Sequence, residues 1–170
     1  MNKLILLSIL IISLGCSNGQ NDIGLISKTT FSVNKLQGEP YNIILSLEKL
    51  NESEYNLIAK IEMDSMSYMA SISESSMKGI FKVNFLDSIN INSSFPLKEI
   101  KHSGASNFIG VGYSHNIVTS NVTYNQKFKI NSHYNFKSTG MIEFVIEPRC
   151  TLEKIPFSLT YKNGKLSLKS

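Results

Sequence analysis

The sequence predicts an all-β sandwich, and three observations support this fold class. From Tyr41 onward, apolar and polar residues alternate with a period of two, which is typical of strands with one buried face. Turn-forming residues separate roughly seven to nine such strands within about 130 residues, as in two packed antiparallel sheets. The dipeptide Asn163-Gly164, which favours a tight hairpin, lies between two of these segments. A closed lipocalin-like barrel is the alternative architecture.

The first strands are identified by their alternation. Residues 57–63 place apolar side chains at the odd positions and mostly polar side chains at the even positions. Residues 81–85 repeat the pattern with Phe81, Val83 and Phe85 on one face. Further apolar stretches predict strands at Tyr41–Leu47, Met66–Ile72 and Phe108–Tyr113.

The clearest alternation spans residues 118–130. One face carries most of the apolar side chains, and we expect it to lie in the core: Val118, Val122, Tyr124, Phe128 and Ile130. The other face has no apolar side chain, and we expect it to lie in water: Thr119, Asn121, Thr123, Asn125, Lys127 and Lys129. Strands are usually about five or six residues long, so this length predicts a bend or a strand that changes sheets.

Two strands, Met141–Ile146 and Ile155–Tyr161, precede the predicted hairpin at Asn163-Gly164. One short helix is expected at Tyr134–Ser138. Proline cannot donate a hydrogen bond to a neighbouring strand, so prolines are expected where strands end. These positions are Pro96, Pro148 and Pro156.

The N-terminus has the features of a bacterial lipoprotein signal peptide. Lys3 is a positive charge before the apolar stretch Leu4–Ile12, which is too short to span a bilayer. Ser13-Leu14-Gly15-Cys16 resembles a lipobox, although its first position departs from the usual Leu. We therefore expect cleavage before Cys16 and attachment of lipid to its sulfur. The alternative is an ordinary secretory signal that is cut elsewhere, with Cys16 lost or left free.

These features divide the chain into three parts. Residues 1–15 are the expected signal peptide, residues 16–40 the acylated Cys16 with a polar tether, and residues 41–170 the β-sandwich. The expected location is the bacterial cell envelope, with the lipid on Cys16 as the contact with the membrane. Ser17 is not the acidic residue that retains some lipoproteins in the inner membrane, which favours the outer membrane.

The charge argues against nucleic acid as a partner. The formal net charge is +4, and removal of Lys3 with the signal leaves +3. Basic residues are dispersed, whereas a nucleic-acid groove would show a basic stripe with interleaved aromatic residues.

No hydrolase, nucleotide-binding or metalloprotease motif is present. The three histidines lie far apart in expected loops, so we predict no metal site and no cofactor. They are His102, His115 and His133. Several tyrosines could line a ligand cavity, although core or edge positions are the more ordinary expectation. They are Tyr68, Tyr113, Tyr124 and Tyr134.

Cys150 is the residue with the most distinctive chemistry, since Cys16 is expected to carry lipid. Arg149 and Lys154 lie beside it in the sequence and could lower the pKa of its thiol, which would favour mixed disulfides with a partner. The alternative is a buried, inert cysteine. We expect the domain to fold without an internal disulfide.

Residues 138–150 and 155–158 resemble the last strands of the N-terminal, periplasmic, immunoglobulin-like domain of the DsbD thiol–disulfide interchange family. The shared pattern is a glycine, alternating apolar residues, a cysteine, a proline and an aromatic strand. The resemblance implies an immunoglobulin-like β-sandwich. Cys150 matches the second cysteine of the family's redox pair, whereas Glu147 stands where the first cysteine should be. A single thiol cannot complete the family's dithiol cycle.

These arguments together predict a lipid-anchored envelope protein whose sandwich is not catalytic and binds a partner protein. An edge strand or the loops at one end would carry the contact. The first alternative is a thiol–disulfide exchange accessory that acts through Cys150. The second is a carrier of a small apolar ligand in a barrel.

Overall fold

The structure is a computed structural model that describes residues 28–33, 39–74, 79–87, 89–102, 105–110 and 113–169. The expected signal peptide, Cys16 and most of the tether lie outside these residues, and so do the predictions made for them. All regular structure within the described residues is β, arranged in antiparallel pairs.

Two open sheets form the body of the molecule. The larger sheet contains β1 (Lys28–Val33), β2 (Tyr41–Lys49), β3 (Glu54–Met63) and β10 (Val122–Ile130), in that order. Two short strands, β6 (Ile91–Asn92) and β7 (Lys98–Lys101), pair with the free side of β10. The smaller sheet contains β13 (Lys165–Lys169), β12 (Thr151–Lys162), β11 (Phe136–Ile146) and β5 (Lys82–Phe85).

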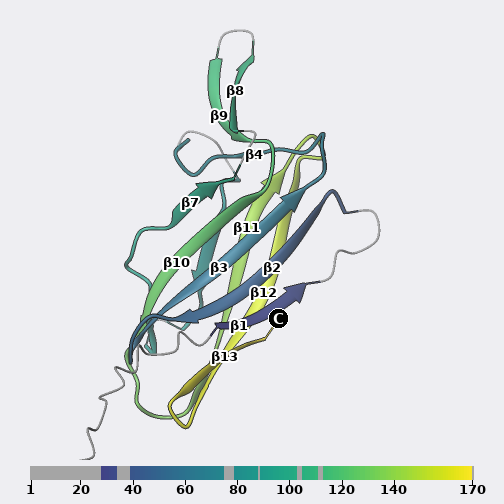
Figure 1. Ribbon diagram of the computed structural model, residues 1–170. Coiled ribbons are helices and arrows are strands. Elements are labelled where there is room, and N and C mark those ends of the chain that lie inside the picture. The colour runs from purple at the N-terminus through teal and green to yellow at the C-terminus, as the bar shows by residue number, and fades with distance from the viewer. Residues whose placement is uncertain are drawn as a thin grey trace, which may run out of the picture.

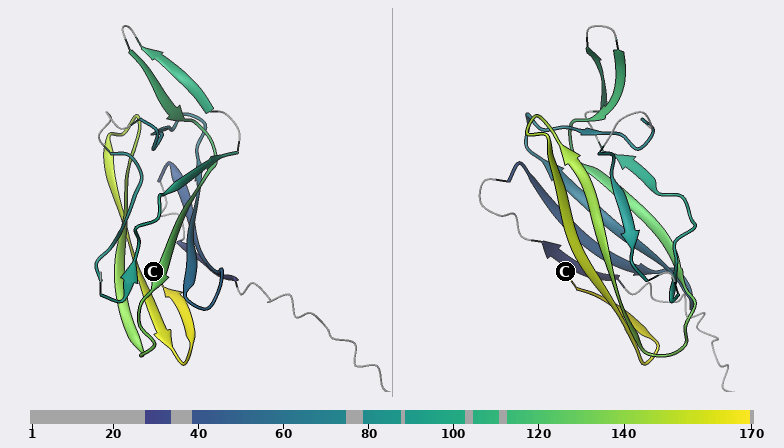
Figure 2. Two further views of the ribbon diagram at one scale, coloured as in Figure 1. Left: turned by 90° about the vertical axis from the view of Figure 1, so that its left-hand side faces the viewer. Right: turned by 180° about the vertical axis from the view of Figure 1, so that it is seen from behind.

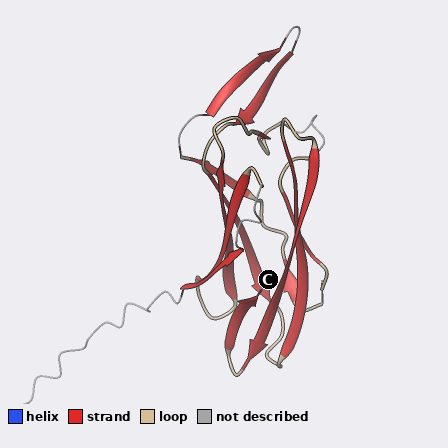
Figure 3. Cartoon of the chain, turned by 90° about the vertical axis from the view of Figure 1, so that its right-hand side faces the viewer, coloured by secondary structure: helices blue, strands red, loops and turns tan. Residues whose placement is uncertain are grey.

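The sheets lie face to face as two layers, which the left view of Figure 2 shows edge-on (Figures 2 and 3). A third, small sheet is made of β4 (Met69–Ala70), β9 (Tyr113–Val118) and β8 (Ala105–Gly110). Its β8–β9 hairpin projects beyond the upper end of the sandwich (Figure 1). The predicted all-β sandwich is confirmed, and the sheets do not close into the alternative barrel.

Aromatic side chains from both sheets fill the space between the layers. Phe81 stacks on Tyr124 with ring centroids 3.8 Å apart, and Phe85 meets the edge of Phe157 at 5.6 Å. Tyr41 of the larger sheet contacts Phe144 of the smaller sheet edge-on at 5.1 Å. Edge-on contacts such as those of Phe85 with Phe157 and of Tyr41 with Phe144 are a favoured ring geometry, and they contribute to the packing of this core.

The segment predicted as one long strand is two strands in different sheets. β9 ends at Val118 in the small third sheet, and β10 begins at Val122 opposite Ile61 of the larger sheet. The predicted change of sheet is thus confirmed. The predicted core face is buried throughout: Val118, Val122, Tyr124, Phe128 and Ile130.

The opposite face of β10 is less exposed than predicted. Thr123, Asn125 and Lys127 are half-buried, because β10 lies inside the sheet with β3 on one side and β7 on the other, and the Phe95 ring lies against the Lys127 ammonium. Alternation predicts which face of β10 each residue occupies. It does not predict which strands lie beside β10, and β3 and β7 come from other parts of the sequence.

The predicted helix at Tyr134–Ser138 is wrong. β11 begins at Phe136, whose ring stacks on Tyr161 of β12 with centroids 5.5 Å apart. This long-range contact extends the strand by two residues before Ser138 and overrides the local preference. The predicted strand at Met66–Ile72 is reduced to β4, and the stretch 108–113 joins two strands instead of forming one.

Pro156 lies inside β12, not at a strand end as predicted. It pairs with Met141 on one side, while the described pairs of β13 on the other side begin at Ser158. Proline lacks the N–H that would donate a hydrogen bond to a neighbouring strand. Among the described pairs, β13 does not extend as far as Pro156, so no hydrogen bond to β13 is lost there. The hairpin prediction at the end of the chain is confirmed, with φ of 52° at Asn163 and 77° at Gly164.

Candidate functional site

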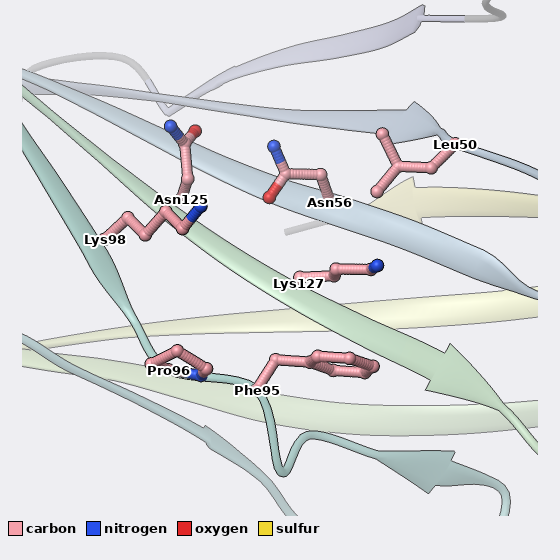
Figure 4. Close-up of a pocket in the computed structure, with 7 residues that line it drawn as sticks. All are labelled: Leu50, Asn56, Phe95, Pro96, Lys98, Asn125 and Lys127. Carbon is pink, nitrogen blue, oxygen red and sulfur yellow. The ribbon is translucent and has the colours of Figure 1, made fainter.

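A groove of about 370 Å³ lies on the outer face of the larger sheet, between the β3–β10 pair and the segment that links β6 to β7. Its floor is formed by side chains of neighbouring strands, and its walls by apolar residues on either side. Figure 4 shows the lining residues, which are Leu50, Asn56, Phe95, Pro96, Lys98, Asn125 and Lys127.

The wall formed by Phe95 and Pro96 follows from the local pairing of β10. β6 pairs with the end of β10 and β7 with its start, so residues 93–97 form an arch beside the middle of the strand. The buried Gln126 holds this arch in place, because its side-chain amide donates a hydrogen bond of 2.9 Å to the carbonyl of Phe95. Pro96 has no N–H to pair with a strand, which is consistent with its position in the arch.

The lining residues supply both apolar surface and hydrogen-bonding groups. The Phe95 ring lies 4.8 Å from the Lys127 ammonium, and this ammonium also pairs with Glu54 at 2.9 Å. Hydrogen bonding from Lys127 and Asn51 lowers the pKa of Glu54 below its usual value, so this carboxylate stays ionised.

Three polar groups of the groove have no protein partner among the described residues. Asn56 and Asn125 make no side-chain hydrogen bond there, and Lys98 forms no ion pair. Two amides can donate and accept, and an ammonium can only donate, so together they suit carbonyl and carboxylate groups.

The sequence pattern does not predict this groove. Alternation places Asn125 and Lys127 on a water-facing strand face, and the predicted contacts are at an edge strand or at end loops. The available signal was the Phe95-Pro96 pair between two short polar stretches, but its position beside β10 depends on two separate pairings.

Cys150 follows β11 in an exposed turn, so the expectation of a buried cysteine is wrong. It is a free thiol, and its backbone is in the left-handed region with a φ of 53°. Its Sγ donates a hydrogen bond of 2.8 Å to Glu147 Oε2. This hydrogen bond raises the pKa of the Cys150 thiol, with smaller contributions from partial burial and from the negative charge of Glu147.

The predicted activation by Arg149 and Lys154 is also wrong. The Arg149 guanidinium donates to Glu39 and to Glu153, each at 2.6 Å, and therefore does not stabilise a thiolate. The Lys154 ammonium lies 3.7 Å from a carboxylate oxygen of Glu143. The basic neighbours in the sequence are thus engaged by carboxylates: Arg149 by Glu39 and Glu153, and Lys154 by Glu143.

We expect the Cys150 thiol to react slowly with iodoacetamide at neutral pH, because only the thiolate is nucleophilic. Glu147→Gln keeps a hydrogen-bonding side chain but removes the charge, and it should lower the pKa of the thiol and increase the alkylation rate. The measurement is the pH dependence of alkylation for both proteins. Equal profiles would show that Glu147 does not control the thiol.

The other candidate residues do not come together. His102 and His133 are exposed, and His102 Nε2 lies 2.7 Å from the Thr123 hydroxyl, whereas the side chain of His115 is outside the described residues. Among the described residues, no group of three or more His, Cys, Asp or Glu is placed to hold a metal ion. Tyr124 is in the core and Tyr134 is exposed, so these two tyrosines do not share a cavity.

No family model matches the sequence, and no curated protein matches it. Among solved structures, the chain is similar to the GAE domain of GGA2p from Saccharomyces cerevisiae, with 12% identity and a TM-score of 0.42. That alignment covers 79% of this chain and 99% of the other. It is also similar to the yeast GGA1 GAE domain, with 9% identity, a TM-score of 0.40, and coverage of 79% and 100%.

Proposed function

We propose that this protein is a lipid-anchored bacterial envelope protein whose β-sandwich binds an extended segment of a partner protein in the groove beside Phe95. The groove is the single observation that carries the proposal. Its free amides and ammonium face a space walled by Leu50, Phe95 and Pro96. An extended segment with an apolar side chain next to a carboxylate would match both kinds of surface.

The lipid anchor remains a proposal that rests on Lys3, the apolar run and Cys16. Within the described part of the chain, no helix is long and apolar enough to cross a membrane. Attachment through Cys16, in the outer membrane by the argument from Ser17, would keep the sandwich at the bilayer surface. Mass spectrometry of the mature N-terminus tests the anchor, because acylation adds the mass of the lipid to a chain that begins at Cys16.

The groove supports partner binding better than the sheet edges do. β7 carries lysine at both ends, and so does β13. Charged side chains on edge strands are a common defence against pairing with another chain. Addition of a partner strand at these two edges is therefore disfavoured.

A redox accessory that acts through Cys150 is the second candidate, and the exposure of this thiol favours it. The resemblance to the DsbD domain points in the same direction. Two features oppose it: the raised pKa of the thiol, and Glu147 at the position of the first cysteine of the family's pair. The carrier hypothesis required a barrel, whereas the sheets are open.

A photo-crosslinking amino acid in place of Asn125 is expected to give an adduct with one envelope protein in living cells. The same amino acid at Lys169, on the edge of the other sheet, is the matched control and should give none. Lys98→Glu reverses the charge at the groove and should reduce the adduct, because a carboxylate of the partner would then be repelled.

Cys150→Ser separates the two candidates. The adduct at position 125 should form equally well without the thiol. Loss of the adduct in Cys150→Ser, together with a mixed disulfide in the unaltered protein, would favour the redox accessory. Equal adduct yields at positions 125 and 169 would contradict the groove as the binding site.

A further inference from the structure

One end of the sandwich has a composition that the proposed partner groove does not explain. We call it the tether end, because β1 begins there at Lys28, opposite Glu48 near the end of β2. It consists of the β2–β3, β5–β6, β10–β11 and β12–β13 connections, at the lower end in Figure 1. The projecting β8–β9 hairpin and Cys150 lie at the opposite end.

Large apolar side chains are exposed at the tether end. Ile89 is 83% exposed, Tyr134 84% and Leu86 69%. Hydrogen bonds join the loops that carry them, because the Asn131 N–H donates to the Asn90 carbonyl at 2.9 Å. The two connections that carry these exposed side chains are therefore neighbours at the same end of the sandwich.

Lysines surround this apolar surface. Four of them are exposed and form no ion pair within the described chain: Lys129, Lys137, Lys162 and Lys165. The carboxylates of this end are Glu48, Glu52, Glu54 and Asp87. Two of these are already neutralised, since Glu52 pairs with Lys49 and Glu54 pairs with Lys127.

Two of the lysines oppose each other in a way that costs stability. Lys162 and Lys165 are direct cross-strand partners on either side of the Asn163-Gly164 turn. Like charges at directly opposite positions destabilise a hairpin, and a bound anion would relieve the repulsion. The Lys162–Lys165 pair therefore lowers the stability of the hairpin in the absence of an anion.

We propose that the tether end lies on an anionic bilayer surface, with Ile89 and Tyr134 in the headgroup region and the lysines among the lipid phosphates. The inference rests on the proposed lipid anchor for bringing the domain to the membrane. Exposed apolar side chains, an interfacial tyrosine and unpaired lysines are the combination that a negatively charged bilayer attracts. The opposite end carries more carboxylates: Glu39, Glu62, Asp64, Glu147 and Glu153. Basic residues pair with three of them, since Arg149 engages Glu39 and Glu153, and Lys60 engages Glu62.

The chain contains no tryptophan, so a single introduced tryptophan reports its own surroundings. Ile89→Trp is expected to shift its emission to shorter wavelength when the mature, full-length protein is reconstituted into vesicles of phosphatidylcholine and phosphatidylglycerol. Brominated lipids should quench it. Met66→Trp, at an 84% exposed position of the opposite end, is the matched control and should do neither.

Charge reversal tests the electrostatic part. In the Ile89→Trp protein, the double variant of Lys162→Glu and Lys165→Glu should lower the ratio of membrane-inserted to water-exposed tryptophan at position 89, as measured by lipid quenching. The expected decrease is about fivefold or more for each lysine. The same reversals at Lys82 and Lys154, at the other end of the smaller sheet, should leave this ratio unchanged. Contact should also weaken in vesicles of phosphatidylcholine alone.

Flotation with the vesicles reports the anchor separately from the tryptophan signal. A protein that floats while Ile89→Trp keeps its emission in water would overturn the inference but not the anchor. Flotation that requires phosphatidylglycerol, together with quenching at position 89, would support the inference and count against the lipid anchor. A protein that neither floats nor shows quenching would overturn both. An emission shift without vesicles that grows with protein concentration would show that a second copy covers this surface, and would also overturn it.

Discussion

Phe128→Ala is expected to lower the free energy of unfolding by about 3–5 kcal/mol, because it removes a buried aromatic ring and leaves a cavity. The Phe128 side chain is fully buried in β10. It stacks on Tyr55 with centroids 5.9 Å apart and lies 5.0 Å from the ring of Phe85, which belongs to the other sheet. The loss would thus weaken the contact between the layers. Urea unfolding of the mature protein measures it.

Lys129→Ala is the matched control, one residue along the same strand. Its side chain is exposed, so its loss should change the free energy by no more than about 0.5 kcal/mol. Whole domains are stable by about 5–15 kcal/mol, and Phe128→Leu keeps a folded protein available if the alanine variant fails to fold. Similar losses at positions 128 and 129 would contradict the register of β10.

Gly140→Ala should destabilise the protein by about 1–3 kcal/mol or more, as overpacking of a core does. Gly140 is the register partner of Phe157, and a Cβ at this position would overlap the Phe157 ring. Its φ is not positive, so the backbone itself would accept alanine. In an open strand the same change would be stabilising, since glycine costs about 0.5–1 kcal/mol relative to alanine. A loss of stability therefore isolates the steric effect.

A double-mutant cycle tests this cause directly. Phe157→Leu removes the part of the ring that lies against Gly140, and Gly140→Ala should then cost less than it does alone. The expected coupling is within about 0.5–3 kcal/mol, the range for residues in contact. Additive losses in thermal or urea unfolding would show that the ring does not limit this position.

The lipid-anchored groove and the tether end are compatible proposals. The groove lies on the flank of the larger sheet, whereas the exposed loops with Ile89 and Tyr134 lie at its end. If both hold, the partner segment binds close to the membrane surface, and the β8–β9 hairpin points away from it.

The sequence by itself determined the features that depend on neighbouring residues. Strict alternation placed Val122, Tyr124 and Phe128 on the core face, because successive side chains of a strand point to opposite sides. Asn163 and Gly164 tolerate the positive φ of a tight turn, which determined the final hairpin.

Only the tertiary structure decided the features that depend on distant residues. Phe136 is in a strand because Tyr161 pairs with it, and Pro156 is tolerated because β13 does not reach it. Arg149 does not activate the Cys150 thiol, because Glu39, 110 residues away in the sequence, and Glu153 engage its guanidinium. The hydrogen bond to the neighbouring Glu147 raises the pKa of the thiol. The groove arises in the same way, because β6 and β7 both pair with β10 and place residues 93–97 beside it. Alternation encodes which face a residue occupies, whereas the strand or loop that covers that face is chosen by packing across the whole chain.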